Sequence, residues 1–263
     1  MKKLTLLFVF AALLTLSACR TVAPVGITQV ATMDALISGN YDGSLPLSQL
    51  HNYGDFGIGT FDRLDGEMIL LNGVIYQVRA DGKVYRPNEG IVTPLASVVH
   101  FQSEKSLTTS DALDMAGLEK AVAVAAPNQN LPCAIKVTGT FSVIKVRSVP
   151  AQTKPYPPLT EVTKTQPVFD YEQVEGTLVG FRQPPFIKGL NMPGFHLHFL
   201  SKDTQKGGHL LGFTLAPGAK IDVQVCNQFQ VILPSGDNDF ARLDLSKDRS
   251  ADVEKAEKAP AAK

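Results

Sequence analysis

The sequence lacks an excess of charge of either sign, and this excludes one class of partner. Lysine and arginine together number 25, as do aspartate and glutamate, so the formal net charge at pH 7 is zero. Proteins that bind nucleic acid carry a surplus of basic residues, because they neutralise phosphates. We therefore expect no nucleic-acid partner.

Long hydrophobic runs are also scarce. The apolar run Leu4–Leu16 follows two lysines and is too short to span a bilayer comfortably as a permanent helix. Residues 1–19 instead have the organisation of a secretory signal, and Leu16–Cys19 resembles the lipobox of bacterial lipoproteins. That resemblance implies cleavage before Cys19, lipidation of Cys19, and an exported protein held to the membrane only by its lipid anchor. An ordinary secretory signal would release the protein instead.

Cysteine is sparse, with three residues in the chain. Cys133 and Cys226 would remain in the exported protein, where a disulfide is permitted. Both lie in apolar, strand-like surroundings, so two separately buried thiols are an equal expectation.

Tryptophan is absent, whereas proline numbers 17 and short apolar runs between glycine and proline outnumber helical patterns. These features predict an α+β fold with two β-rich domains built on mixed or antiparallel sheets. The proline-rich segment 151–168 is the predicted linker between an N-terminal α+β domain at 20–150 and a C-terminal zinc-binding domain at 169–263 with a polar tail. We expect helices at 32–38, 44–50 and 111–125, and strands at 67–71, 74–78, 93–101, 134–149, 172–182 and 221–233.

Histidine is rare too, but three of the five histidines fall in one short stretch. His196 and His198 are two residues apart in a predicted strand, so their side chains leave the same face. The polar segment 201–208 ends in two glycines and suits a hairpin loop, which would bring His209 back on the neighbouring strand. If His198 lies opposite His209, all three imidazoles converge.

Three neutral imidazoles with an open fourth position are typical of a catalytic zinc site. No cysteine lies near the hairpin, which argues against a structural Cys/His site. The alternative is three solvated histidines on an outer face, but the apolar residues between them favour the metal. Zinc held in this way can activate water or polarise substrate oxygens.

Two charged residues interrupt otherwise apolar strands. Glu67 opens the strand 67–71 and is either a rim residue or a carboxylate facing a cavity. Arg147 shares strand parity with Phe141 and Val143, which look core-facing. A guanidinium on an apolar face needs a carboxylate partner, which a substrate or an internal salt bridge would supply.

These motifs together resemble those of the α-acetolactate decarboxylase family. The resemblance covers about 28–254 and rests on Gly59–Met68, on Val146-Arg147, and on Gly194–Phe199 with Gly207–His209. It implies conversion of (S)-2-acetolactate to (R)-acetoin and carbon dioxide, a fold of two α+β domains and a homodimer. Many members of the family lack a secretory signal, so the signal with its lipobox is a difference. It would change the location of the protein but not its chemistry.

The resemblance also implies the site residues. Zinc would be bound by His196, His198 and His209, with Glu67 and Arg147 as catalytic residues and Thr60 lining the substrate pocket beside Arg147. A second catalytic glutamate would come from the tail, where Glu254 matches best and Glu257 is the alternative.

The expected chemistry requires no organic cofactor. Zinc chelating the hydroxyl and ketone oxygens of acetolactate would stabilise the enediolate formed as carbon dioxide leaves. Arg147 would orient the carboxylate, but arginine holds its proton too tightly to be a good proton donor. Water or a glutamate would deliver that proton, and Glu67 would hold or exchange the hydroxyl proton.

Two other functions would use the same histidines. A zinc hydrolase would generate hydroxide and cleave esters or amides without releasing carbon dioxide. A non-catalytic metal-binding lipoprotein, such as a zinc carrier, would be a binding module. Such carriers often contain histidine-rich tracts, and none is seen here.

Overall fold

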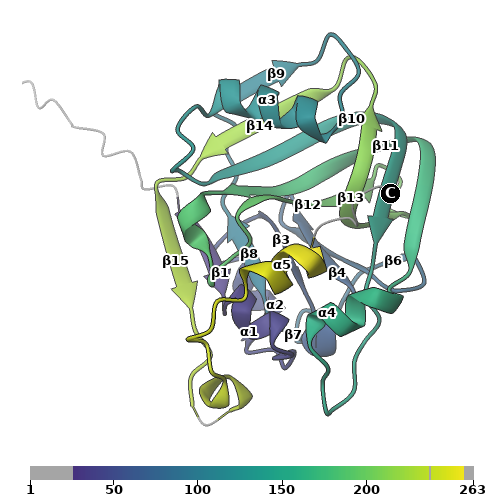
Figure 1. Cartoon of the computed structure of the whole chain (residues 1–263). Coiled ribbons are helices and arrows are strands. Elements are labelled where there is room, and N and C mark those ends of the chain that lie inside the picture. The colour runs from purple at the N-terminus through teal and green to yellow at the C-terminus, as the bar shows by residue number, and fades with distance from the viewer. Residues whose placement is uncertain (1–25, 237, 258–263) are drawn as a thin grey trace, which may run out of the picture.

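Two β-sheets, one above the other in Figure 1, make up most of the fold. The computed structural model describes residues 26–236 and 238–257, so the predicted signal and Cys19 lie outside the described residues. In spatial order the first sheet contains β15 (Gln228–Ile232), β1 (Gly26–Val30), β8 (Ala96–Val99), β3 (Phe56–Thr60), β4 (Glu67–Leu71), β5 (Val74–Val78) and β6 (Val84–Tyr85). The second contains β11 (Val168–Gln183), β12 (Gly194–Ser201), β13 (Gly207–Leu215), β10 (Cys133–Arg147), β14 (Lys220–Val225) and β9 (Lys105–Thr108).

The first sheet is mixed and the second antiparallel. β1 pairs with β15 in parallel, while its other neighbour β8 is antiparallel. In the second sheet β10 also pairs with β11, which closes β10, β11, β12 and β13 into a ring. The short strands β2 (Leu45–Pro46) and β7 (Val92–Thr93) form a separate pair. The expectation of mixed sheets with few helices is therefore confirmed.

The α-helices of residues 26–236 and 238–257 are short, and three of them pack together. They are α1 (Met33–Ile37), α2 (Leu47–Leu50), α3 (Met115–Ala125), α4 (Leu159–Val162) and α5 (Ser250–Glu257). α3 packs on the second sheet, and α1, α4 and α5 share one apolar cluster. In Figure 1, α5 (yellow) crosses the middle of the molecule, between the strands of the second sheet and helices α1 and α2.

The two sheets do not follow the boundary predicted at the proline-rich segment 151–168. β9 and β10 precede this segment but belong to the second sheet, whereas β15 follows it and pairs with β1. The segment itself contains α4, which packs against α1 and α5. Proline fixes the backbone locally, but the pairing of distant strands decides which sheet each strand joins.

Local signals predicted several elements well. The Thr32 hydroxyl caps α1 by accepting from the Ala35 amide, and Asn72 and Gly73 both have positive φ in the turn between β4 and β5. The third helix begins later than expected, because Asp114 caps it in place of Ser110. The strand expected at 221–233 is two strands, β14 and β15, which lie in different sheets.

One apolar cluster fills the ring of the second sheet, and another lies between the two sheets. The inside of the ring packs with α3 around residues such as Phe141 and Phe199, while residues such as Ile69 and Leu200 fill the layer between the sheets. Cys133 and Cys226 are free, buried thiols. Burial raises the pKa of Cys133 to about 11 and that of Cys226 to about 12.

None of the helices within 26–236 and 238–257 is long and apolar enough to span a membrane.

Candidate active site

The three histidines of the hairpin converge, as the spacing predicted. His196 and His198 lie on β12, and His198 is directly opposite His209 on β13. The ring centroids are 5.2 Å apart for His196 and His198, 5.0 Å for His196 and His209, and 5.3 Å for His198 and His209. One nitrogen from each ring lies within 4.8 Å of the others. The triad faces the first sheet, because the alternate residues Leu197 and Phe199 point into the ring of the second sheet.

Backbone carbonyls orient two of the imidazoles. His198 donates from Nδ1 to the Met68 carbonyl at 2.9 Å, and His209 donates from Nε2 to the Glu257 carbonyl at 2.9 Å. These bonds leave the lone pairs on His198 Nε2 and His209 Nδ1. Within the described part of the chain, the buried His198 Nε2 has no hydrogen-bond partner.

The triad has the properties of a metal-binding donor set. Burial lowers the pKa of His196 and lowers the pKa values of His198 and His209 well below the ordinary value, so the rings are neutral at pH 7. Neutral imidazoles held by outer hydrogen bonds, with an orphaned ring nitrogen directed inward, fit a divalent metal ion.

Arg147 lies beside the triad because its strand adjoins the hairpin. In the pairing of β10 with β13, Arg147 is directly opposite His209. The side chain is 3 % exposed. Its Nη1 donates to Gln166 Oε1 at 2.7 Å, and its Nη2 donates to Glu257 Oε2 at 2.9 Å. Glu67 Oε1 is farther away, 3.9 Å from Nη1.

A β-bulge changes the parity that the sequence suggested for Arg147. The pairing of β10 with β13 shifts between Phe141 and Val143, leaving Ser142 without a partner. Phe141 is fully buried, whereas Val143 is 44 % exposed, so these two residues do not share a face. Arg147 shares the face of Val143 and is buried because Glu67 and α5 cover that end of the strand.

Glu67 faces the cavity rather than the rim. It lies on β4 directly opposite Thr60 on β3, and both side chains are buried. Glu67 Oε2 is 3.6 Å from His198 Nε2. Thr60 donates its hydroxyl to the Gly66 carbonyl at 2.7 Å, and Gly66 takes a positive φ of 86° in the turn that leads into Glu67.

Burial raises the pKa of Glu67 to about 7. The Arg147 guanidinium opposes this rise, and the Glu257 carboxylate adds to it. Glu67 therefore lies close to the point at which it can either hold or release a proton at neutral pH.

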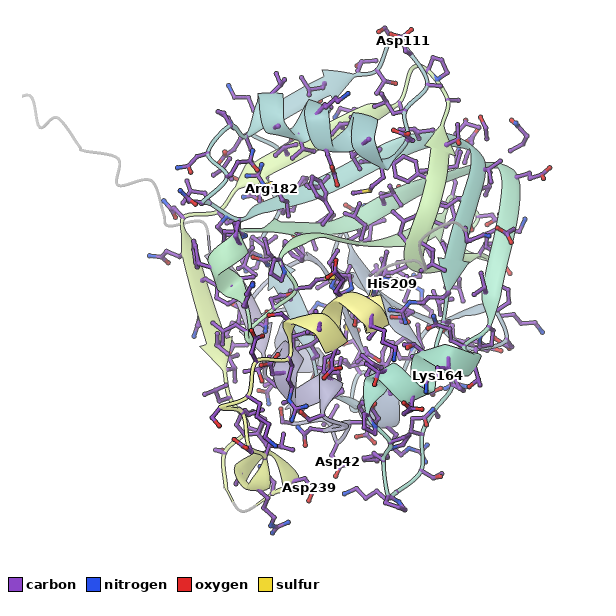
Figure 2. The ribbon with its side chains drawn as sticks, viewed as in Figure 1. Asp42, Asp111, Lys164, Arg182, His209 and Asp239 are labelled. Carbon is purple, nitrogen blue, oxygen red and sulfur yellow. The ribbon has the colours of Figure 1, made fainter. Side chains whose placement is uncertain are left out.

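The tail carboxylate at the site is Glu257, not Glu254. Glu257 Oε2 is 3.6 Å from His209 Nδ1 and 3.9 Å from His196 Nε2, in addition to its bond to Arg147. Glu254 is exposed and lines a neighbouring cavity with Lys188 and Asn191. Both glutamates lie on α5, and only the docking of that helix distinguishes them. Figure 2 shows His209 beside α5.

Two cavities meet at the triad. The inner cavity, about 30 Å³, is lined by the charged residues and by an apolar wall from both halves of the chain. Its lining residues are Leu36, Gly59, Thr60, Leu64, Glu67, Leu95, Arg147, Val149, Leu159, His196, His198, His209 and Glu257. The outer cavity, about 260 Å³, shares His196, His209 and Glu257 with it and extends past Met115 on α3.

Sequence reasoning missed Gln166 and the leucine side of the inner cavity. Gln166 lies in the segment that was predicted to be a linker, and no local pattern connects it with Arg147. Leu36, Leu64 and Leu159 are ordinary apolar residues of short helices or turns, and only packing brings them to the site.

The chain is similar over most of its length to proteins of one family. A family model described as alpha-acetolactate decarboxylase matches residues 27–247. A protein of that name from Methanosarcina mazei is 44% identical over 88% of this chain and 79% of its own length, and one from Brevibacillus brevis is 41% identical over 87% and 80%. A crystal structure of alpha-acetolactate decarboxylase from Bacillus subtilis superposes with a TM-score of 0.86 at 35% identity, covering 89% of this chain and 100% of that one. The chain therefore belongs to the alpha-acetolactate decarboxylase family.

Proposed function

We propose that the protein decarboxylates (S)-2-acetolactate to (R)-acetoin and carbon dioxide at the histidine triad. The observation that carries the proposal is the buried Arg147 guanidinium beside three neutral imidazoles in one small cavity, in a chain of this family. Acetolactate has a carboxylate and a hydroxyl on one carbon and a ketone on the next. A cation for the carboxylate and a metal for the two oxygens match those groups.

The metal we propose is zinc, held by His196, His198 and His209. Three imidazoles leave a coordination position for substrate, and imidazole is a common zinc ligand. Zinc, when bound, supplies a Lewis acid that polarises the hydroxyl and ketone oxygens of the substrate.

Arg147 is the proposed carboxylate-binding residue. Its Nη2 already donates to the carboxylate of Glu257 at 2.9 Å, so the buried guanidinium is positioned to bind a carboxylate at this end of the cavity. A planar guanidinium can hold the substrate so that the bond to the departing carbon dioxide is fixed in direction.

Glu67 and Glu257 are the proposed proton-handling residues. When the carbon–carbon bond breaks, its electron pair moves into the adjacent ketone, and the product carbon must then take up one proton. Glu67 has a pKa near the working pH and lies 3.6 Å from His198, so it can hold the hydroxyl proton of the substrate. Glu257 lines both cavities and can deliver a proton directly or through water.

We further propose that the protein is exported and anchored by a lipid on Cys19, and that it acts as a homodimer. The sequence Leu16–Cys19 supports the anchor. The dimer rests on the family resemblance.

The function is tested by assaying protein that lacks residues 1–19 for carbon dioxide and acetoin from racemic acetolactate. We expect zinc-dependent release of both products, with half of the racemate consumed rapidly. Ester or amide hydrolysis without carbon dioxide would instead indicate a hydrolase. Stoichiometric zinc with no turnover of either kind would indicate a binding protein.

A further inference from the structure

The guanidinium of Arg147 donates a hydrogen bond to an uncharged side chain, that of Gln166, which has no role in the proposed mechanism. Gln166 Oε1 accepts from Nη1 at 2.7 Å, closer than either glutamate lies to this side chain. Nη2 donates to Glu257, while the buried Nε has no hydrogen-bond partner among the described residues. We propose that Gln166 is a positioning residue, which fixes the plane of Arg147 so that the substrate carboxylate meets its Nε and Nη2 edge. This inference rests on the proposed function.

Backbone pairing between β10 and β11 places Gln166 beside Arg147. Val168 pairs with Arg147 at the start of β11, and the Ser148 amide donates to the Pro167 carbonyl at 3.3 Å. Gln166 is extended, with φ −64° and ψ 139°, as expected for a residue that precedes proline. The half-buried side chain is therefore held beside Arg147 by hydrogen bonds of the strands and not only by its own bond.

The planar geometry of the guanidinium explains why fixing Nη1 affects how the other nitrogens meet a carboxylate. The guanidinium is a rigid planar fork with five donors, and Nε and Nη2 form one of its two-pronged edges. The bond from Nη1 to Gln166 holds the plane of the guanidinium, and Nε–H together with the second N–H of Nη2, the one not donated to Glu257, remains for a carboxylate. Without Gln166, Nη1 would still have the Glu67 carboxyl group nearby, with Oε1 at 3.9 Å. A shift toward Glu67 would turn the fork away from the substrate.

The neutrality of Gln166 is also part of the inference. Glu67 and Glu257 already place two carboxyl groups beside one guanidinium. An amide oxygen accepts a hydrogen bond without adding a third negative charge. The positive charge of Arg147 therefore remains available to an anionic substrate.

The test is to compare two ligands that differ in having a carboxylate. Zinc-loaded Gln166→Leu protein is titrated calorimetrically with 2-hydroxy-2-methylpropanoate, which has the hydroxyl and carboxylate, and with acetoin, which has the hydroxyl and ketone. We expect affinity for the carboxylate ligand to fall roughly 10- to 100-fold, the range for a lost hydrogen bond to a charged group. Acetoin affinity and zinc content should stay within about twofold of the wild type. With acetolactate, KM should rise more than kcat falls.

Gln166→Asn keeps the amide but shortens the side chain by one methylene, and should show the same selective loss. Gln166→Glu keeps the length and should also bind the carboxylate ligand weakly, because its charge competes for Arg147. Thr165→Ala, at an exposed neighbour, is the matched control and should behave as the wild type. Equal weakening of both ligands in Gln166→Leu and Gln166→Asn, or unchanged affinity for both, would overturn the inference. Absence of carbon dioxide release by the wild type would overturn the proposed function instead, and the two titrations would still decide the role of Gln166.

Discussion

The carboxylate of Glu257 lies 2.9 Å from Nη2 of Arg147, although the two residues are 110 positions apart in the chain. The backbone carbonyl of the same glutamate accepts from His209 Nε2. The end of α5 therefore supplies one carboxylate to the arginine and orients one ring of the triad. Glu257 lines the inner cavity together with Glu67.

Removing one histidine should remove the metal. Protein lacking residues 1–19 should contain about one zinc per chain, and His198→Ala should lose it, because two remaining imidazoles bind zinc far more weakly. His100→Ala, at an exposed histidine, is the matched control and should keep its zinc. Elemental analysis after gel filtration measures both, and full zinc retention in His198→Ala would refute the triad as the metal site.

Glu67 and Arg147 should be required for chemistry but not for the metal. Glu67→Gln and Arg147→Ala should retain zinc and lose at least about 100-fold in single-turnover carbon dioxide release, the lower range for a positioned proton-transfer group. Arg147→Lys should recover little, since a point charge cannot replace a planar two-pronged clamp. Near-normal release by both variants would remove these residues from the mechanism.

The two tail glutamates provide a matched pair. Glu257→Gln removes the charge beside Arg147 and the triad and should lower kcat/KM by at least about 10-fold. Glu254→Gln changes an exposed residue of the same helix and should leave kcat/KM within about twofold. Steady-state assays of the two variants side by side decide the question, and the reverse ranking would restore Glu254 as the catalytic carboxylate.

The raised pKa of Glu67 should make the metal-free protein less stable as pH rises. Because the folded protein binds this proton more tightly than the unfolded chain, the stabilising contribution is fully present below about pH 4.5 and is lost as pH rises through about 7. Relative to Glu67→Gln, the wild type should lose on the order of 1–3 kcal/mol of unfolding free energy over this interval. Groups away from the site contribute equally to both proteins and cancel in the difference. Urea unfolding in the presence of a chelator measures the unfolding free energy of both proteins at each pH. Parallel curves of unfolding free energy against pH would contradict the raised pKa of Glu67.

The lipid anchor is tested separately from the chemistry. Cys19→Ser should abolish lipid attachment and move the protein from the membrane fraction to the soluble fraction, because several acyl chains are needed for firm binding. Decarboxylation should persist. Unchanged processing and fractionation would favour an ordinary secretory signal.

The sequence by itself determined the centre of the site. A two-residue spacing places His196 and His198 on one face of any strand, and the glycines at the end of the polar turn bring His209 back beside them. These relationships depend on neighbours along the chain or across one hairpin, so local stereochemistry is enough to predict them. The sequence also singled out Glu67 and Arg147 as charged residues in apolar strands, but it left open whether Glu67 faces a cavity and which partner Arg147 has.

Only the tertiary structure decided which distant groups complete the site. The choice of Glu257 over Glu254 depends on how α5 docks against α1 and α4, and the partnership of Gln166 with Arg147 depends on the pairing of β10 with β11. The membership of β10 and β15 in their sheets, and the bulge at Ser142 that sets the face of Arg147, likewise follow from long-range pairing. Such contacts form because they bury apolar surface across the whole fold, and local sequence propensity cannot predict them.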